Sequence, residues 1–291
     1  MPRRRYKPES LALIGTGLIG ASIGLAARGR GFSVTGWDVS ARALRGAQKR
    51  RAISRIAASL QDAVASSDIV VLAAPLDATL AHLRQVFEFA RPGTLVIDVA
   101  GVKEPVSKRA AALLARRRDV CFVAGHPIAG SEHSGPAAAD AKLFARRAFA
   151  LYAPPQTSRT QAYEAAARFV RKLGAVPLRI APRDHDRAMA ALSALPQLAS
   201  IAVALASGDS GAAIERRLAG PGYRDATRLA ESGFAMWKPA LSANRANVLR
   251  SIRAMSKRVS VIQAALQRRD WRVLGRLFSA AGRERRRVNP R

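Results

Sequence analysis

The segment LALIGTGLIGASIGLAA, residues 11–27, carries the clearest structural pattern in this sequence. A short apolar run ends in a GxGxxG pattern, formed by Gly15, Gly17 and Gly20, and an apolar helical segment follows. In such a strand–turn–helix, the first glycine permits a tight turn and the second lets a pyrophosphate approach the backbone. The third lets the helix pack on the strand, and the helix N-terminus offers free N–H groups to phosphates. The stretch therefore predicts a dinucleotide site; a glycine-rich turn without a ligand is the alternative.

Asp38 supplies the second half of this pattern. The segment FSVTGWD, residues 32–38, predicts a second strand that ends in this acid. A carboxylate there accepts hydrogen bonds from the adenosine ribose and repels a 2′-phosphate, so NAD is favoured over NADP. Arg42 weakens the preference for NAD, since its side chain can pair with a 2′-phosphate. The alternative role for Asp38 is that of a helix cap, although Ser40 is the better cap. The residues expected to bind NAD are Gly15, Gly17, Leu18, Ile19, Gly20, Asp38, Ala74 and Pro75.

The first half of the chain alternates strands and helices. Apolar runs bounded by turns predict strands of a parallel sheet that is covered on both faces. These runs are residues 68–75, 93–101, 119–127, 148–154 and 175–182.

The carboxyl ends of these strands are where doubly wound sheets bind ligands. Residues 73–75, 98–103 and 125–135 are therefore expected to face one cofactor cleft. Cys121, the single cysteine, lies inside a predicted strand and is expected to be a core residue. A chain with one cysteine forms no internal disulfide, and a cytoplasmic setting is the simplest interpretation.

After about residue 182 the predicted strands stop and consecutive helices follow. The sequence predicts an α/β fold with an N-terminal Rossmann dinucleotide-binding domain, residues 1–182, and an all-α domain, residues 183–291. Residues 283–291 are expected to be a basic tail, and residues 191–207 a buried helix. Long alanine-rich helices with no other partner predict a homodimer made through the helical domain.

The net charge of +29 comes from 49 Lys and Arg residues against 20 Asp and Glu residues. Such a field attracts anions, of which nucleic acid is one. Aromatic residues are not interleaved with the arginine clusters, as a stacking surface would require. The sequence therefore favours a solvated basic surface, with no specific nucleic acid and no membrane as partner. The basic and apolar N-terminus mimics a secretory signal, but the glycine spacing is better explained by the dinucleotide turn.

Residues 125–135, GHPIAGSEHSG, place a histidine and a glutamate in a glycine-rich loop. This loop, together with GTGLIGASIG, DVAGVK, HDRAMAALSALP and GYRDATRLAESGFAMW, occurs in an order and spacing that resembles the prephenate/arogenate dehydrogenase family of tyrosine biosynthesis. The resemblance runs from about residue 10 to about residue 270. It implies NAD-dependent oxidative decarboxylation of prephenate to 4-hydroxyphenylpyruvate. Arogenate, or both substrates, is the alternative.

The resemblance also assigns roles to residues. His126 is implied as the general base on the substrate's 4-hydroxyl, a role that suits an imidazole. Arg228 is implied as the residue that binds a carboxylate of the dicarboxylate substrate, through its guanidinium fork. Glu132 and Ser131 are implied in shaping the pocket. As an alternative, His126 is a turn histidine bonded to backbone groups. Arg228 would then form a surface salt bridge, and Glu132 and Ser131 would be helix caps.

Other residues of the matching segments are expected to be structural. His133 is expected to be solvated. Arg224 and Trp237 are expected to stabilise the helical packing or a dimer. His185 and Asp186 are interpreted as a helix start with inter-domain hydrogen bonds rather than as chemistry.

The sequence departs from the family pattern at two places. Gly101 occupies a position where family members commonly carry a serine near the catalytic histidine. Ala194 and Gln197 replace two histidines, and Gln197 keeps hydrogen-bonding capacity but does not titrate. Both Gly101 and Gln197 are expected to lie at the substrate. These changes leave open the choice between prephenate and arogenate, and inhibition by tyrosine.

Two other protein classes share features with this sequence. A 3-hydroxyacid dehydrogenase would carry a catalytic lysine within residues 183–206, and no lysine lies there. A basic nucleic-acid-binding or regulatory protein that lost catalysis would explain Gly101 and Gln197. His126 and Arg228 argue against it. No metal site is predicted.

Overall fold

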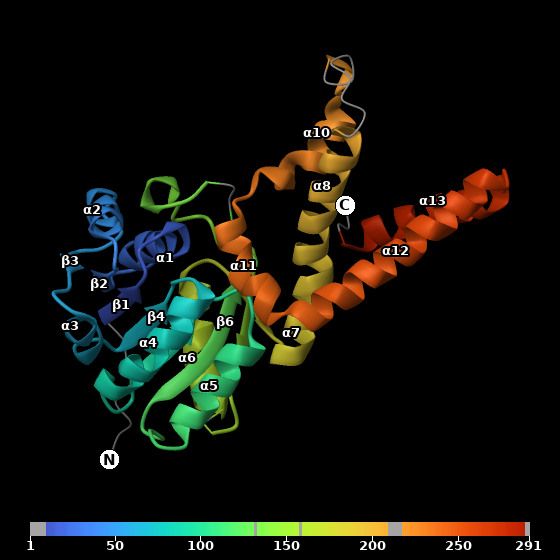
Figure 1. Cartoon of the computed structure of the whole chain (residues 1–291). Helices are drawn as coiled ribbons and strands as arrows, with labels where there is room; N and C mark the ends of the chain where they lie inside the picture. The colour runs from blue at the N-terminus through green and yellow to red at the C-terminus, as the bar shows by residue number, and fades with distance from the viewer. Residues whose placement is uncertain (1–9, 131–132, 157–158, 209–216, 289–291) are drawn as a thin grey trace.

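The computed structural model describes residues 10–130, 133–156, 159–208 and 217–288. An α/β lobe holds the first part of this chain, and a helical lobe follows it (Figure 1). Two long helices at the C-terminal end extend away from the α/β lobe (Figure 1).

One sheet of eight strands forms the centre of the α/β lobe, in the order β3-β2-β1-β4-β5-β6-β7-β8. All neighbours pair in parallel except β6 and β7, which are antiparallel. The strands are β1 (Ser10–Ile14), β2 (Ser33–Trp37), β3 (Arg55–Ile56), β4 (Ile69–Leu72), β5 (Leu95–Asp98), β6 (Cys121–Pro127), β7 (Ala148–Tyr152) and β8 (Val176–Arg179).

Helices cover both faces of this sheet, because the strands are apolar on both sides. In β1, Leu11 and Leu13 belong to one hydrophobic core while Ala12 and Ile14 belong to the other. Helices α1 and α6 contribute to the first core, and α3, α4 and α5 to the second. The helices are α1 (Leu18–Arg28), α2 (Ala41–Lys49), α3 (Leu60–Ala65), α4 (Leu76–Phe89), α5 (Glu104–Leu114) and α6 (Arg159–Lys172), with a short 3-10 turn η1 (Pro136–Ala138).

The predicted Rossmann-like sheet followed by helices is confirmed, and each predicted strand is present. Two details differ. The two-residue strand β3 was not predicted, because so short a segment carries no periodic signal. The sheet is not wholly parallel, since β7 runs against β6.

The helical lobe begins with one continuous helical segment, residues 182–208. It consists of α7 (Pro182–Met189), the π-helical turn η2 (Ala190–Ala194) and α8 (Leu195–Gly208). The following elements are α10 (Pro221–Thr227), η3 (Arg228–Glu231), α11 (Phe234–Ala243), α12 (Arg245–Gln267) and α13 (Trp271–Val288).

The expectation that residues 191–207 form a buried helix is wrong for the single chain. The apolar side chains of Leu192 and Leu205 are each 66% exposed, whereas the polar Gln197 and Ser200 are buried. The segment is long and apolar enough to cross a membrane by length and composition, yet only 22% of its most apolar window is buried. Apolar composition alone did not reveal that its outer face lies open.

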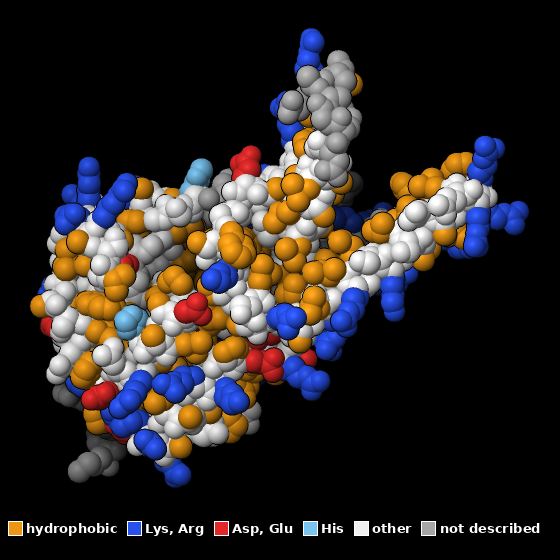
Figure 2. All heavy atoms as spheres, viewed as in Figure 1, with side chains coloured by type: hydrophobic (Ala, Val, Ile, Leu, Met, Phe, Trp, Pro, Cys, Tyr) orange, Lys and Arg blue, Asp and Glu red, His pale blue; other side chains and the backbone are white. Residues whose placement is uncertain are grey.

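The arginine-rich end of the chain also differs from the expectation. Residues 283–288 were expected to belong to a basic tail, but they continue α13. Figure 2 shows hydrophobic side chains gathered along the two C-terminal helices, with basic side chains beside them. The exposed apolar residues there include Trp271 and Phe278, which are 65% and 79% exposed.

Candidate active site

The glycine turn between β1 and α1 has an open helix N-terminus. Gly15 has φ of +98°, and a Cβ on it would lie 2.5 Å from the carbonyl oxygen of Ala73. A Cβ on Gly20 would collide with the carbonyl oxygen of Gly15. At Gly17, by contrast, a Cβ would meet no atom within 4 Å, and no side chain caps α1. The turn thus packs tightly on one side and leaves room for a phosphate on the other.

Asp38 fixes the glycine turn from the end of β2. Its Oδ2 accepts hydrogen bonds from the backbone N and Oγ1 of Thr16, at 2.7 and 3.1 Å. Its Oδ1 accepts from the backbone N of Ser40 at 2.9 Å. Ser40 in turn caps α2 by accepting from the N–H of Ala43, so the prediction for Ser40 is confirmed. The carboxylate of Asp38 therefore lies beside the turn that would hold the pyrophosphate.

Ala74 and Pro75 lie on the same edge of the sheet. The carbonyl oxygen of Ala74 accepts from Thr79 Oγ1 at 3.0 Å, and Pro75 is the residue before α4. A Cβ on Gly15 would lie 2.9 Å from the backbone N of Ala74. The structure thus brings this segment against the glycine turn, where the cofactor-binding residues were expected.

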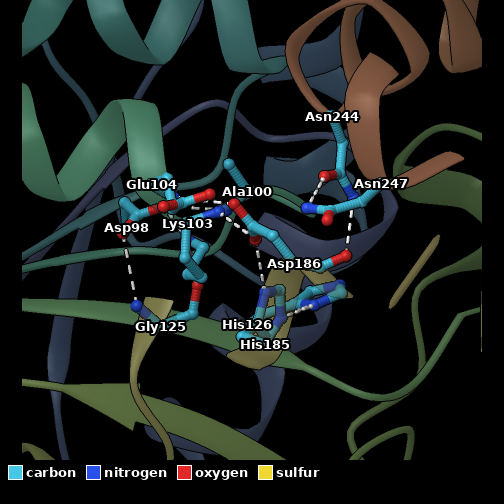
Figure 3. Close-up of polar contacts among 10 residues, drawn as sticks. All are labelled: Asp98, Ala100, Lys103, Glu104, Gly125, His126, His185, Asp186, Asn244 and Asn247. Carbon is cyan, nitrogen blue, oxygen red and sulfur yellow. Dashed lines mark hydrogen bonds and ion pairs between the residues drawn. The ribbon is translucent and has the colours of Figure 1, made fainter. Parts of the chain in front are cut away.

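A buried ion pair joins the ends of β5 and β6. Lys103, just before α5, donates through Nζ to Asp98 Oδ2 and to the carbonyl oxygen of Gly125, the latter at 2.6 Å. Both side chains are at most 2% exposed. Burial raises the pKa of the Asp98 carboxyl and lowers the pKa of the Lys103 amine, and their mutual attraction opposes both shifts. The pair thus holds the backbone of Gly125, the residue before His126 (Figure 3).

His126 lies near the end of β6, with its two ring nitrogens in different surroundings. Nδ1 lies 2.9 Å from Nε2 of His185. A Cβ on Gly101 would lie 3.9 Å from His126 Nε2, so this nitrogen faces the Gly101 backbone. Burial holds the pKa of His126 well below its usual value, and the positive charge of Lys103 and the nearby His185 lower it further. An imidazole whose Nε2 has no hydrogen-bond partner among the described residues can accept a proton at this edge of the sheet.

His185 and Asp186 connect the helical lobe to this cluster (Figure 3). His185 Nδ1 lies 2.7 Å from Asp186 Oδ1. Asp186 also accepts from the backbone N–H groups of Lys103 and Glu104, at 2.7 and 2.9 Å. Asn244 donates from Nδ2 to the carbonyl oxygen of Asp186 at 2.7 Å. The expected hydrogen bonds between the lobes are present, whereas the contact of His185 with His126 was missed.

Two model comparisons identify the family. Residues 23–178 match the family model described as prephenate dehydrogenase, nucleotide-binding domain, and residues 181–280 match the model described as prephenate dehydrogenase, dimerization domain. The chain belongs to the prephenate dehydrogenase family.

Named relatives agree with this assignment. The chain is 31% identical to the prephenate dehydrogenase of Bacillus subtilis, over 94% of this chain and 74% of that protein. It is 28% identical to the cyclohexadienyl dehydrogenase of Zymomonas mobilis, over 81% of each chain. The fold is similar to that of Synechocystis arogenate dehydrogenase, with a TM-score of 0.81, 26% identity and coverage of 96% and 99% of the two chains. It also matches Aquifex aeolicus prephenate dehydrogenase in complex with hydroxyphenyl propionate and NAD⁺, with a TM-score of 0.86, 22% identity and coverage of 98% and 100%.

Gln197 and Arg228 lie together in the helical lobe of this prephenate dehydrogenase family member. The Nε2 of Gln197 donates to the carbonyl oxygen of Leu229 at 2.8 Å, and its buried Oε1 has no partner among the described residues. Arg228 precedes Leu229, begins η3 and is exposed. Within the described chain, no ion pair joins Arg228 to either acid next to it in sequence, Asp225 or Glu231.

The remaining predicted residues have mixed outcomes. Ser131 and Glu132 lie outside the described residues, and His133 is exposed. Trp237 packs against the small core of the helical lobe, as expected. Arg224 is exposed in α10. In the described chain no group of three His, Cys, Asp or Glu residues could hold a metal ion.

Proposed function

We propose that this chain is an NAD-dependent prephenate dehydrogenase that converts prephenate to 4-hydroxyphenylpyruvate. Membership of the family supports the reaction class. The single observation that carries the proposal is the position of His126, whose Nε2 faces Gly101 at the sheet edge that also holds the glycine turn. A proton acceptor and a dinucleotide turn on one edge are what hydride removal from an alcohol carbon needs.

The proposed cofactor is NAD. The uncapped N-terminus of α1 and the open space at Gly17 fit its pyrophosphate, and the carboxylate of Asp38 fits the ribose hydroxyls. Bound there, NAD supplies the hydride acceptor. The same carboxylate would repel the 2′-phosphate of NADP, which is why we favour NAD.

His126 takes the proton of the substrate's 4-hydroxyl in this proposal. The hydride leaves the carbon that bears the hydroxyl, and the bond to the ring carboxylate breaks to release carbon dioxide. The electron pair of that bond completes the aromatic ring. Since aromatisation drives the reaction, the protein's own task is to hold the dicarboxylate in place and remove one proton.

Arg228 is proposed to bind a substrate carboxylate from the helical lobe. Its guanidinium is exposed and forms no ion pair with an acid among the described residues, so its fork is available to an anion. Gln197, bonded to the residue after Arg228, is proposed to lie near the substrate side chain. Because its amide does not titrate, arogenate remains the second candidate substrate, and the relatives include enzymes of both names.

NADH absorbance tests the proposal. Purified protein is assayed with prephenate and arogenate, each with NAD and NADP, beside His126→Asn and Arg228→Ala. Prephenate with NAD is expected to give NADH, with kcat reduced roughly 10²-fold to 10⁴-fold in His126→Asn. Arg228→Ala is expected to raise KM for the substrate and to leave NAD affinity unchanged. Absence of turnover with all four pairs, in protein that binds NAD, would refute the proposed activity.

The quaternary state proposed is a homodimer built through the helical lobe. The match to a dimerization-domain model over residues 181–280 supports it. A hollow of about 340 Å³ lies between α8, α11 and α12, and its lining combines the apolar Leu198, Phe234, Leu241, Val248 and Leu249 with Lys238, Ser242 and Arg245. Exposed apolar side chains on α8, α12 and α13 would be covered by the same faces of a second copy.

A further inference from the structure

The carboxylate of Asp186 fixes the position of a proton on His185. Both oxygens of Asp186 already accept backbone N–H groups, from Lys103 at Oδ1 and from Glu104 at Oδ2. The contact between Asp186 Oδ1 and His185 Nδ1, at 2.7 Å, therefore has the histidine as donor. Asp186 is 1% exposed, so water does not compete for these bonds. In a neutral ring, a proton on Nδ1 leaves Nε2 of His185 as an acceptor.

This acceptor in turn fixes the proton on His126. Nε2 of His185 lies 2.9 Å from Nδ1 of His126, and two bare nitrogens do not attract each other. Nδ1 of His126 therefore carries the proton and donates it to His185. The Nε2 of His126 is left with a free lone pair on the side that faces Gly101. That is the form of the ring that can remove a proton from a hydroxyl.

We propose that His185 and Asp186 are positioning residues, which hold His126 in its proton-accepting form and take over the positive charge when His126 receives the substrate's hydroxyl proton. This inference rests on the proposed function, because it concerns the same base. It assigns both residues, and the start of α7 on which they lie, a part in the reaction.

The charges around the pair explain why the proton should move on. Lys103, just before α5, and Asp98 on β5 lie on one side of His126, and the amine of Lys103 disfavours a second positive charge there. On the other side, His185 contacts the carboxylate of Asp186. Glu104 donates a backbone N–H to that carboxylate, and Asn244, the residue before α12, is neutral. A positive charge is therefore better placed on His185 than on His126.

The low pKa of His126 is consistent with this view. A base with so low a pKa is a poor proton acceptor by itself. In the proposed sequence, the hydroxyl proton forms a bond to His126 Nε2 as hydride leaves. The proton on His126 Nδ1 then passes to His185 Nε2, and His185 keeps its Nδ1 proton on Asp186. When the bond to the ring carboxylate breaks, its electron pair passes through the ring to the oxygen, which takes a proton back from His126 Nε2. His185 returns its extra proton to His126 Nδ1 at the same time, so the product leaves as a phenol and no net proton is released.

Imidazole ¹⁵N NMR tests the geometry without any substrate. The full chain has four histidines, so the signals of His126 and His185 can be assigned from single variants. At neutral pH both rings are expected to carry their proton on Nδ1. A proton on Nε2 of His126 would overturn the proposal. This result is independent of turnover, so it is distinguishable from a failure of the proposed function.

The steady-state kinetics of His185→Gln test the role of His185 in the reaction. The glutamine oxygen can still accept from His126 Nδ1, but it cannot hold a proton. We expect kcat to fall on the order of 100-fold with the KM for NAD unchanged. The acid limb of the kcat/KM profile is expected to move to lower pH, because only His126, with its lowered pKa, is left to protonate. Asp186→Asn, whose oxygen can still face Lys103 and His185, is expected to lower kcat without preventing folding.

His82→Gln on α4 is the matched control, since His82 packs on Trp37 and contacts neither of the paired histidines. It should keep the wild-type pH profile. The proposal is refuted if the acid limb of His185→Gln stays at the wild-type pH, or if His185→Gln and His82→Gln lose equal amounts of kcat. His185 would then have a packing role only. No turnover by the wild-type chain on either substrate would instead refute the proposed function, and the NMR result would stand alone.

Discussion

At the scale of single residues, His126 makes folding sensitive to acid. Its pKa is well below the usual value of a histidine, mainly because of burial. Below about pH 6.5 the unfolded chain binds a proton at this residue that the folded chain does not bind. The free energy of unfolding therefore falls as pH decreases through this range, by at most about 1.4 kcal/mol per pH unit from this residue.

His126→Asn is expected to remove this part of the pH dependence. Urea unfolding at about pH 7.5 and about pH 5.5 measures it, and the wild type should lose more stability than the variant. Equal losses in the two proteins would show that His126 does not resist protonation in the folded state.

Gly101 offers a second test at this scale. A Cβ there would make an ordinary contact 3.9 Å from His126 Nε2, and the backbone does not have positive φ. Gly101→Ser should therefore fold normally and place a hydroxyl beside the reacting nitrogen. One added hydrogen bond of about 1 kcal/mol would raise kcat about fivefold. Gly101→Ala is the control without the hydroxyl, and a similar gain in it would contradict this explanation.

At the scale of elements, the glycine turn separates folding from cofactor binding. Gly17→Ala should leave stability within about 0.5 kcal/mol, because the new methyl group meets no atom within 4 Å. NAD affinity should fall roughly 10-fold to 100-fold, as the methyl group displaces a charge-assisted bond to phosphate. Gly20→Ala should instead disrupt the turn, since its methyl group collides with the Gly15 carbonyl. Thermal unfolding and NADH fluorescence titration distinguish the two outcomes.

The buried pair that joins β5 to α5 should contribute far more to stability than a surface pair. Lys103→Met leaves the Asp98 carboxylate buried without its cation, which costs roughly 3–5 kcal/mol. Arg55→Ala breaks the exposed pair with Asp62, and it should cost less than about 1 kcal/mol. Denaturant unfolding of both variants measures the difference. A comparable small loss in each would mean that Lys103 is not paired in the folded protein.

Local patterns in the sequence predicted the elements, but not all of their partners. The turn at Gly15–Gly20, the strand ends and the start of the helical lobe follow from spacing of nearby residues. The antiparallel pairing of β7 and the contact between His126 and His185 join residues far apart in sequence, so no local pattern encodes them. The apolar composition of residues 191–207 predicts a buried helix, but composition does not say which surface covers it.

At the scale of the whole molecule, the open apolar faces make association the expected state. Sedimentation velocity at micromolar concentration should give a dimer. Phe278→Asp, at a side chain 79% exposed on α13, should shift the equilibrium toward monomer. Val39→Asp is the control, at a side chain 84% exposed on the α/β lobe, and it should leave the dimer intact. A monomeric wild type, or equal effects of the two variants, would contradict a dimer through the helical lobe.

The hydrogen bond from Asn244 to the Asp186 carbonyl has a consequence for communication between subunits. Asn244 is the residue from which α12 begins, and α12 is a rod of 23 residues, about 35 Å long. A rod held at one end acts as a lever. If a second copy binds the C-terminal end of α12, a tilt of the helix there would displace Asp186 and with it the two histidines. The positions of His126 in the two subunits of a dimer would then be coupled, and substrate binding to one subunit would shift His126 in the other.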